Sequence, residues 1–71
     1  MTPIKERMKF LGIRQVDMIL VLRERGITVQ PPELSIILNG ISTSPKARRV
    51  MSACNEIVAT RERELVGHAI N

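Results

Sequence analysis

The positions of proline and glycine constrain the fold of this chain more than any other sequence feature. Three prolines each follow a polar residue, in the pairs Thr2-Pro3, Gln30-Pro31 and Ser44-Pro45. Such a pair is typical of a helix N-cap and the first helical position. Three glycines stand where an apolar periodic stretch stops, at Gly12, Gly26 and Gly40. Glycine tolerates the left-handed conformation that often follows a helix end. Together these residues predict four helices in an all-α fold.

Apolar periodicity gives each helix an expected buried face. The helices are expected over residues 3–11, 15–25 and 31–38, and from residue 45 to between residues 59 and 66. Spacings of three and four residues predict these inward stripes in chain order: Ile4, Met8 and Leu11; Val16, Ile19, Leu20 and either Leu22 or the aliphatic stem of Arg23; Leu34, Ile37 and Leu38; Val50, Cys54 and Ile57. Met18 and Val21 are also apolar, so the apolar face of the second helix is wide. On the first helix, Lys5, Arg7 and Lys9 are expected to point away from the core.

Length and composition predict a single soluble domain, residues 1–71, with residues 60–71 as a helical tail or dimerisation extension. Hydrophobic residues make up 44% of the chain and Phe10 is its only aromatic, so the core must be aliphatic. No apolar run approaches the roughly 18 residues of a membrane span, and the charged N-terminus is unlike a signal peptide. Cys54 has no second cysteine to pair with. A cytoplasmic protein with no membrane partner is therefore expected.

The charge and the residue types favour an anionic partner over catalysis. The net charge of +4 suggests an affinity for phosphates. No nucleophile stands with a base and an orienting group, and no Gly-rich phosphate loop or metal-ligand spacing occurs. Asp17, Glu24 and Glu56 are isolated carboxylates, and His68 has no second histidine or cysteine nearby. The sequence predicts no enzyme, no cofactor and no metal.

Between Leu11 and Ile57 a few short motifs follow one another in a characteristic order and spacing: Leu11-Gly12-Ile13 leading to Gln15, Gly26-Ile27-Thr28, Leu34 with Ile37, and Asn39-Gly40. In these motifs the segment resembles the lambda-repressor-like, or Cro and XRE-type, DNA-binding family. The resemblance implies a compact bundle of four or five helices with a helix-turn-helix in the second and third helices. It also implies a repressor-like transcription regulator that reads double-stranded DNA in the major groove. The style is that of small phage or prophage regulators.

The same resemblance assigns two sets of contact residues. The implied base-reading residues are Gln30, Pro32, Glu33, Ser35, Ile36 and Asn39. The implied phosphate contacts are Arg14, Gln15, Ser42, Thr43, Ser44, Lys46, Arg48 and Arg49. Glutamine suits adenine, glutamate suits cytosine and an apolar side chain suits the thymine methyl, whereas nothing in the first set binds guanine as arginine does. A site of mixed or A·T-leaning composition is expected, unless Glu33 merely caps its helix.

A second apolar line in the last helix suggests a two-fold dimer. The proposed contacts are Met51, Val58, Leu65, Val66 and Ile70. In the alternative, Met51 and Val58 belong to the core and the tail after Thr60 is a solvated helix. A different function is also open: a protein interaction module of the same fold, like an anti-repressor or antitoxin, that binds another regulator. Binding of RNA or single strands is disfavoured, because one phenylalanine offers no stacking platform.

Overall fold

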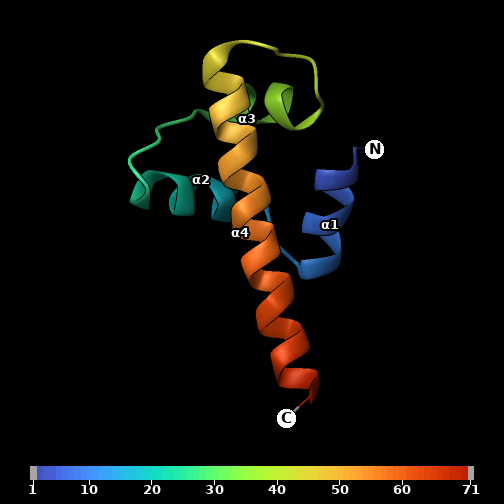
Figure 1. Cartoon of the computed structure of the whole chain (residues 1–71). Helices are drawn as coiled ribbons and strands as arrows, with labels where there is room; N and C mark the ends of the chain where they lie inside the picture. Colours follow the sequence, from blue (N-terminus) through green and yellow to red (C-terminus); the bar gives the residue numbers. More distant parts are fainter. Residues whose placement is uncertain (1, 71) are drawn as a thin grey trace.

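One long helix forms the axis of the molecule, and three short helices pack around one part of it (Figure 1). The computed structural model describes residues 2–70, with the side chains of residues 2–67. Within them the chain is all-helical, with the elements α1 (Pro3–Leu11), α2 (Gln15–Glu24), α3 (Pro31–Leu38) and α4 (Pro45–Ile70). None of these helices combines the length and the apolar character that a membrane span requires. The C-terminal part of α4 projects beyond the other helices.

The helix ends follow the local signals. The predicted bounds of α1 and α3 are confirmed, α2 ends one residue early at Glu24, and α4 continues past residue 66. The three glycines expected to end helices all have positive φ, at 72°, 80° and 75°. Ser44 caps α4, because its Oγ accepts the backbone N–H of Ala47 at 3.1 Å. Proline and glycine therefore place the helix ends next to them from local sequence, whereas the end of α4 was not predicted.

Thr2 does not cap α1 with its side chain, contrary to expectation. Its hydroxyl instead donates to the carbonyl oxygen of Leu38 at 2.7 Å. That carbonyl lies in the last turn of α3 and lacks an intrahelical partner, so it offers the hydroxyl an acceptor that sequence does not reveal. The bond fastens the start of α1 to the end of α3.

The core is aliphatic, as predicted, and Phe10 lies outside it with 81% of its surface exposed. The predicted inward residues of α1, α3 and α4 are buried, except that Leu11 is only partly covered. Val29, between α2 and α3, is also buried. Burial raises the pKa of the Cys54 thiol to about 11, so the thiol stays protonated at neutral pH. Cys54 therefore behaves as a small hydrophobic residue.

The predicted buried face of α2 is right in part. Leu22 is fully buried and Ile19 packs partly buried on the core, as predicted. Val16 and Leu20, also predicted to be buried, are each 50% exposed, and Met18 is fully buried instead. Apolar residues occur on nearly all sides of this helix, so periodicity alone does not distinguish one face from another. The contacts of α2 with both α3 and α4 select the face that carries Met18 and Leu22.

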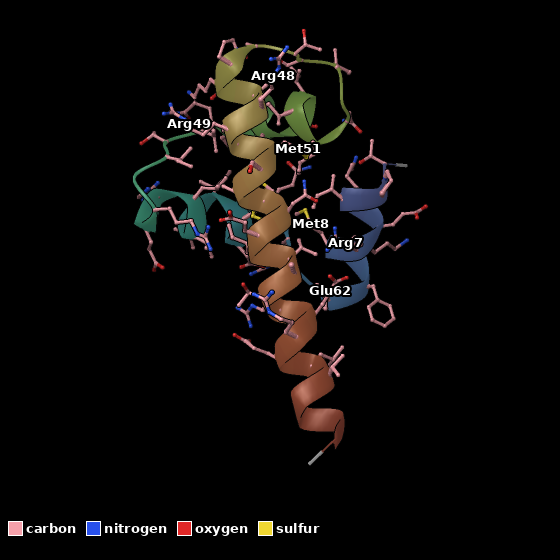
Figure 2. All side chains as sticks on the ribbon, in the orientation of Figure 1. Arg7, Met8, Arg48, Arg49, Met51 and Glu62 are labelled. Carbon is pink, nitrogen blue, oxygen red and sulfur yellow. The ribbon has the colours of Figure 1, made fainter. Side chains whose placement is uncertain are left out.

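Arg7 does not point into solvent, as was expected, but ties α1 to α4. Its Nη2 and Nε donate to the two carboxylate oxygens of Glu62 at 2.6 and 3.1 Å, and its Nη1 donates to Asn55 Oδ1 at 3.2 Å (Figure 2). This two-pronged geometry suits the planar guanidinium. The pair orients α1 on α4 at the point where α4 leaves the body of the molecule.

A pair of glycine substitutions tests the role of glycine after a helix end against its role within a helix. Gly26→Ala is expected to lower the free energy of unfolding by about 1 kcal/mol, since its φ of 80° strains an L-residue. Gly67→Ala is expected to raise it by up to about 1 kcal/mol, because Gly67 lies within α4. An added Cβ would meet no atom within 4 Å at either position, so the change in unfolding free energy reflects backbone conformation and not packing in both variants. Urea denaturation measures both, and equal stability of the two variants would contradict the prediction.

Candidate functional site

The exposed face of α3 carries residues whose direction is set by the buried face of the same helix. Leu34, Ile37 and Leu38 are buried, which turns Pro32 and Ile36 outward along with Ser35 and Asn39. Ile36 is 45% exposed, although it is a large apolar residue. The eight residues of α3 include no lysine or arginine. The face is thus apolar at its centre and uncharged apart from Glu33 at its margin.

A groove of about 550 Å³ runs between this face and the segment that leads into α4. It is lined by Gln30, Pro32, Glu33, Ile36, Ile37, Ser42 and Ser44. The structure therefore brings together four of the six predicted base-reading residues with two of the predicted phosphate contacts. The other two members of the base-reading set, Ser35 and Asn39, do not line this groove.

Asn39 lies toward α1 and its amide is already engaged. Its Nδ2 donates to the backbone carbonyl of Ser35 at 2.8 Å, and its Oδ1 accepts Lys5 Nζ at 3.1 Å. Lys5 therefore lies beside the C-terminal end of α3. This placement was not predicted, because Lys5 was expected to point away from the core and its partner Asn39 is 34 residues away in sequence.

Glu33 is held at the N-terminal end of α3 by two donors. Its carboxylate accepts the backbone N–H of Gln30 at 3.4 Å and pairs with Lys46 Nζ at 3.1 Å. The first contact is the glutamate half of the predicted capping box. The second balances the charge of Lys46, a predicted phosphate contact, with an acid of the same chain. Lys46 and Glu33 thus act as a pair, and neither presents a free charge at the groove.

The start of α2 is already occupied by a carboxylate. Asp17 Oδ2 accepts the backbone N–H of Arg14 at 2.9 Å, and the Arg14 side chain donates Nε to Oδ2 at 3.1 Å and Nη2 to Oδ1 at 3.3 Å. These bonds hold the pKa of Asp17 below its ordinary value. The backbone N–H of Arg14, an implied phosphate contact, is therefore already bound by Asp17. The signal was available, since Asp17 stands three residues after the N-cap Arg14.

Arg48 and Arg49 leave α4 on different sides (Figure 2). Arg48 lines a groove of about 530 Å³ with Ser42, Thr43 and Asn55. Arg49 lines a separate groove beside Arg25, next to α2. Within the part of the chain that the structure describes, neither arginine forms an ion pair. Arg48 therefore shares its surface with predicted phosphate contacts, and Arg49 does not.

The five residues suggested for a dimer contact do not share one surface. Val58 is fully buried within the chain, so it is not available to a second copy, and this part of the prediction is wrong. Met51 is half-buried and packs on the core. Leu65 and Val66 are 51% and 55% exposed on the projecting end of α4. The side chain of Ile70 lies outside the described residues.

Two of the ion pairs predict how stability changes in acid. Hydrogen bonds from Arg14 lower the pKa of Asp17, and hydrogen bonds from Arg7 lower the pKa of Glu62. Stability from these carboxylates is present above their ordinary pKa and is lost as the pH falls through the lowered, folded-state pKa. The urea midpoint should therefore fall between about pH 5 and pH 2.

Substitutions test whether the carboxylates of Asp17 and Glu62, and not those of other acidic residues, cause the fall of the urea midpoint in acid. Asp17→Asn combined with Glu62→Gln should flatten the fall of the urea midpoint in acid. Glu24→Gln, at an exposed residue outside the ion pairs of the described residues, should leave the wild-type slope unchanged. A slope in the double variant equal to that of Glu24→Gln would contradict the assignment.

The side chains described by the structure include no group of three His, Cys, Asp or Glu residues placed to hold a metal ion. The chain matches no protein-family model, and no curated protein or solved structure matches it.

Proposed function

We propose that this chain is a repressor-like transcription regulator that binds specific sequences of double-stranded DNA. In this proposal α2 and α3 act as a helix-turn-helix, and the exposed face of α3 enters the major groove. The observation that carries the proposal is the locked direction of that face: its buried residues point Pro32 and Ile36 outward, beside a groove that also holds Gln30, Ser42 and Ser44. An α-helix fits the width of the major groove.

Base reading would fall to fewer residues than the sequence suggested. Gln30 is exposed at the start of α3 and can hold adenine through N6 and N7. Ile36 and Pro32 can pack on thymine methyl groups. Glu33 is less suited to cytosine, because its carboxylate is engaged with Lys46 and the Gln30 backbone. The preferred site is therefore A·T-leaning, without dominant guanines opposite α3.

Phosphate contacts would come from the loop before α4 and from its first turns. Arg48 shares a groove with Ser42 and Thr43, and its guanidinium is outside the ion pairs of the described residues. Phosphate contacts position a protein on DNA without reading sequence. In this proposal Arg48 supplies affinity for the DNA backbone, while α3 supplies the preference for a base sequence. A regulator of the phage or prophage type would act in the bacterial cytoplasm, where its DNA target lies.

The test is selection of binding sites from random-sequence duplexes, followed by a salt series. We expect enrichment of A·T-leaning sites and an affinity that falls steeply with salt. Arg48→Gln should weaken binding to all duplexes about equally, whereas Gln30→Ala should change which duplex is preferred. Enrichment of no duplex would contradict the proposed function. Enriched sites dominated by guanines opposite α3 would contradict the assignment of base-reading residues.

The projecting end of α4 supports a dimer as part of this proposal. Leu65 and Val66 are exposed apolar neighbours on a helix that extends beyond the body of the molecule. Burial of these side chains between two copies would remove apolar surface from water and produce a two-fold site with paired half-sites. Sedimentation equilibrium at tens of micromolar should give the mass of two chains. A mass of one chain would contradict the dimer and leave the DNA proposal standing.

A second candidate function rests on the exposed side of α2. Val16 and Leu20 lie one turn apart, and Leu20 borders a cleft lined by Leu11 and Ile13. Exposed apolar surface of this kind is typical of a protein contact. In this candidate function the chain binds another regulator through α2. Leu20→Glu would then disrupt that complex, whereas under the DNA proposal it leaves duplex binding unchanged.

A further inference from the structure

A cleft between α1 and the start of α2 places Lys5 and Lys9, which the proposed DNA contacts leave unused, beside the implied phosphate contact Arg14. The cleft measures about 340 Å³ and is lined by Lys5, Met8, Lys9, Gly12, Ile13, Arg14, Gln15 and Leu38. We propose that it binds a backbone phosphate of duplex DNA beside the C-terminal end of α3. This inference rests on the proposed function and adds Lys5 and Lys9 to its phosphate contacts.

The two lysines lie outside the ion pairs of the described residues, and Arg14 keeps hydrogens for such a contact although it pairs with Asp17. Lys5 and Lys9 are one helical turn apart, and neither forms an ion pair among residues 2–67. Among the described residues, Lys5 donates only to the neutral Asn39 Oδ1, which leaves two ammonium hydrogens. Arg14 gives Asp17 its Nε–H and one Nη2–H, and three of its five N–H groups stay available.

The lining of the cleft combines cationic side chains with apolar side chains, and this combination favours a bound anion. Met8, Ile13 and Leu38 supply apolar surface, so one side of a bound phosphate would be shielded from water. Charge interactions strengthen where water is excluded. The carboxylate that pairs with Arg14 belongs to Asp17, which lines the neighbouring cleft between α2 and α4 instead. The cleft itself is lined by three cations and no acid.

The position of the cleft relates it to α3. Lys5 contacts Asn39 and the cleft includes Leu38, so it lies at the C-terminal end of α3. Lys46 lies at the other end, where it contacts Glu33. The ends of an eight-residue helix are about 12 Å apart. A phosphate in the cleft would therefore be distinct from one held near Ser44, and α3 would be anchored at both ends.

The test compares the salt dependence of duplex binding in matched variants. Lys9→Gln should lower the affinity for every duplex by the same factor and reduce the magnitude of the log affinity–log salt slope by about 0.9. Lys5→Gln combined with Lys9→Gln should reduce it by about 1.8. Arg23→Gln removes the same charge from an exposed residue of α2 outside the cleft and should leave the slope unchanged.

The outcomes separate the cleft from the function on which it rests. If Lys9→Gln behaves like Arg23→Gln while Arg48→Gln still weakens binding, the cleft proposal is overturned and the DNA proposal stands. If the wild-type chain binds no duplex, both are overturned. Inorganic phosphate is the second probe, followed through the backbone amides of Gly12 and Gln15. Saturation there with an unchanged duplex slope in the double lysine variant would identify a free-phosphate site and overturn the contact with DNA.

Discussion

Leu34→Ala is expected to lower the free energy of unfolding by about 3 kcal/mol, because truncation of a buried leucine loses apolar burial and leaves a cavity. Leu34 is fully buried in the core that α3 shares with α2 and α4. A single core in a chain of 71 residues rarely supplies more than about 3–5 kcal/mol of net stability. The variant should therefore be largely unfolded at 37 °C, as measured by helical circular dichroism during urea and thermal denaturation.

The matched control lies two residues away on the same helix. Ile36→Ala also truncates a large aliphatic side chain, but that side chain is on the exposed face of α3. Its unfolding free energy should stay within about 0.5 kcal/mol of the wild type. If the two variants lose equal stability, the assigned rotation of α3 is wrong, and with it the face proposed to read DNA.

Ile36→Glu is expected to weaken duplex binding by about 100-fold or more while the fold is retained. The new carboxylate would lie in the groove that already contains Glu33, on the face proposed to enter the major groove. It would lose contact with a thymine methyl and would repel the phosphates on both sides. Fluorescence anisotropy with a selected duplex measures the affinity, and circular dichroism confirms the helical content.

Leu20→Glu is the control for this substitution. Leu20 is exposed to a similar extent on α2 and does not line the α3 groove. It receives the same charge, so a loss of affinity specific to Ile36→Glu isolates the face of α3. If Leu20→Glu impairs duplex binding and Ile36→Glu does not, the surface that contacts the duplex is on α2. That result would overturn the reading role proposed for α3.

Sequence predicted which residues form the candidate site better than it predicted which side chains pair with one another. Buried residues at spacings of three and four place Ile36 outward, and sequence alone predicts this. The partners of the charged residues were not predictable in most cases. Arg7 pairs with Glu62, 55 residues away, and Lys5 contacts Asn39, 34 residues away. The Arg14–Asp17 pair is the exception, because three residues of helix bring the two side chains together.

Sequence by itself determined where the four helices begin and where α1 and α3 end, and it placed the end of α2 within one residue, but it did not predict the end of α4. Proline restricts φ and lacks an N–H, and glycine accepts the left-handed conformation, so both act within a few residues of their own position. Tertiary structure alone decided which side of α2 is buried and which cations stay free. These outcomes depend on groups distant in sequence: α3 and α4 select Met18 and Leu22, while Glu33 neutralises Lys46. A helix that is apolar on many sides has no local reason to prefer one face, so packing chooses it.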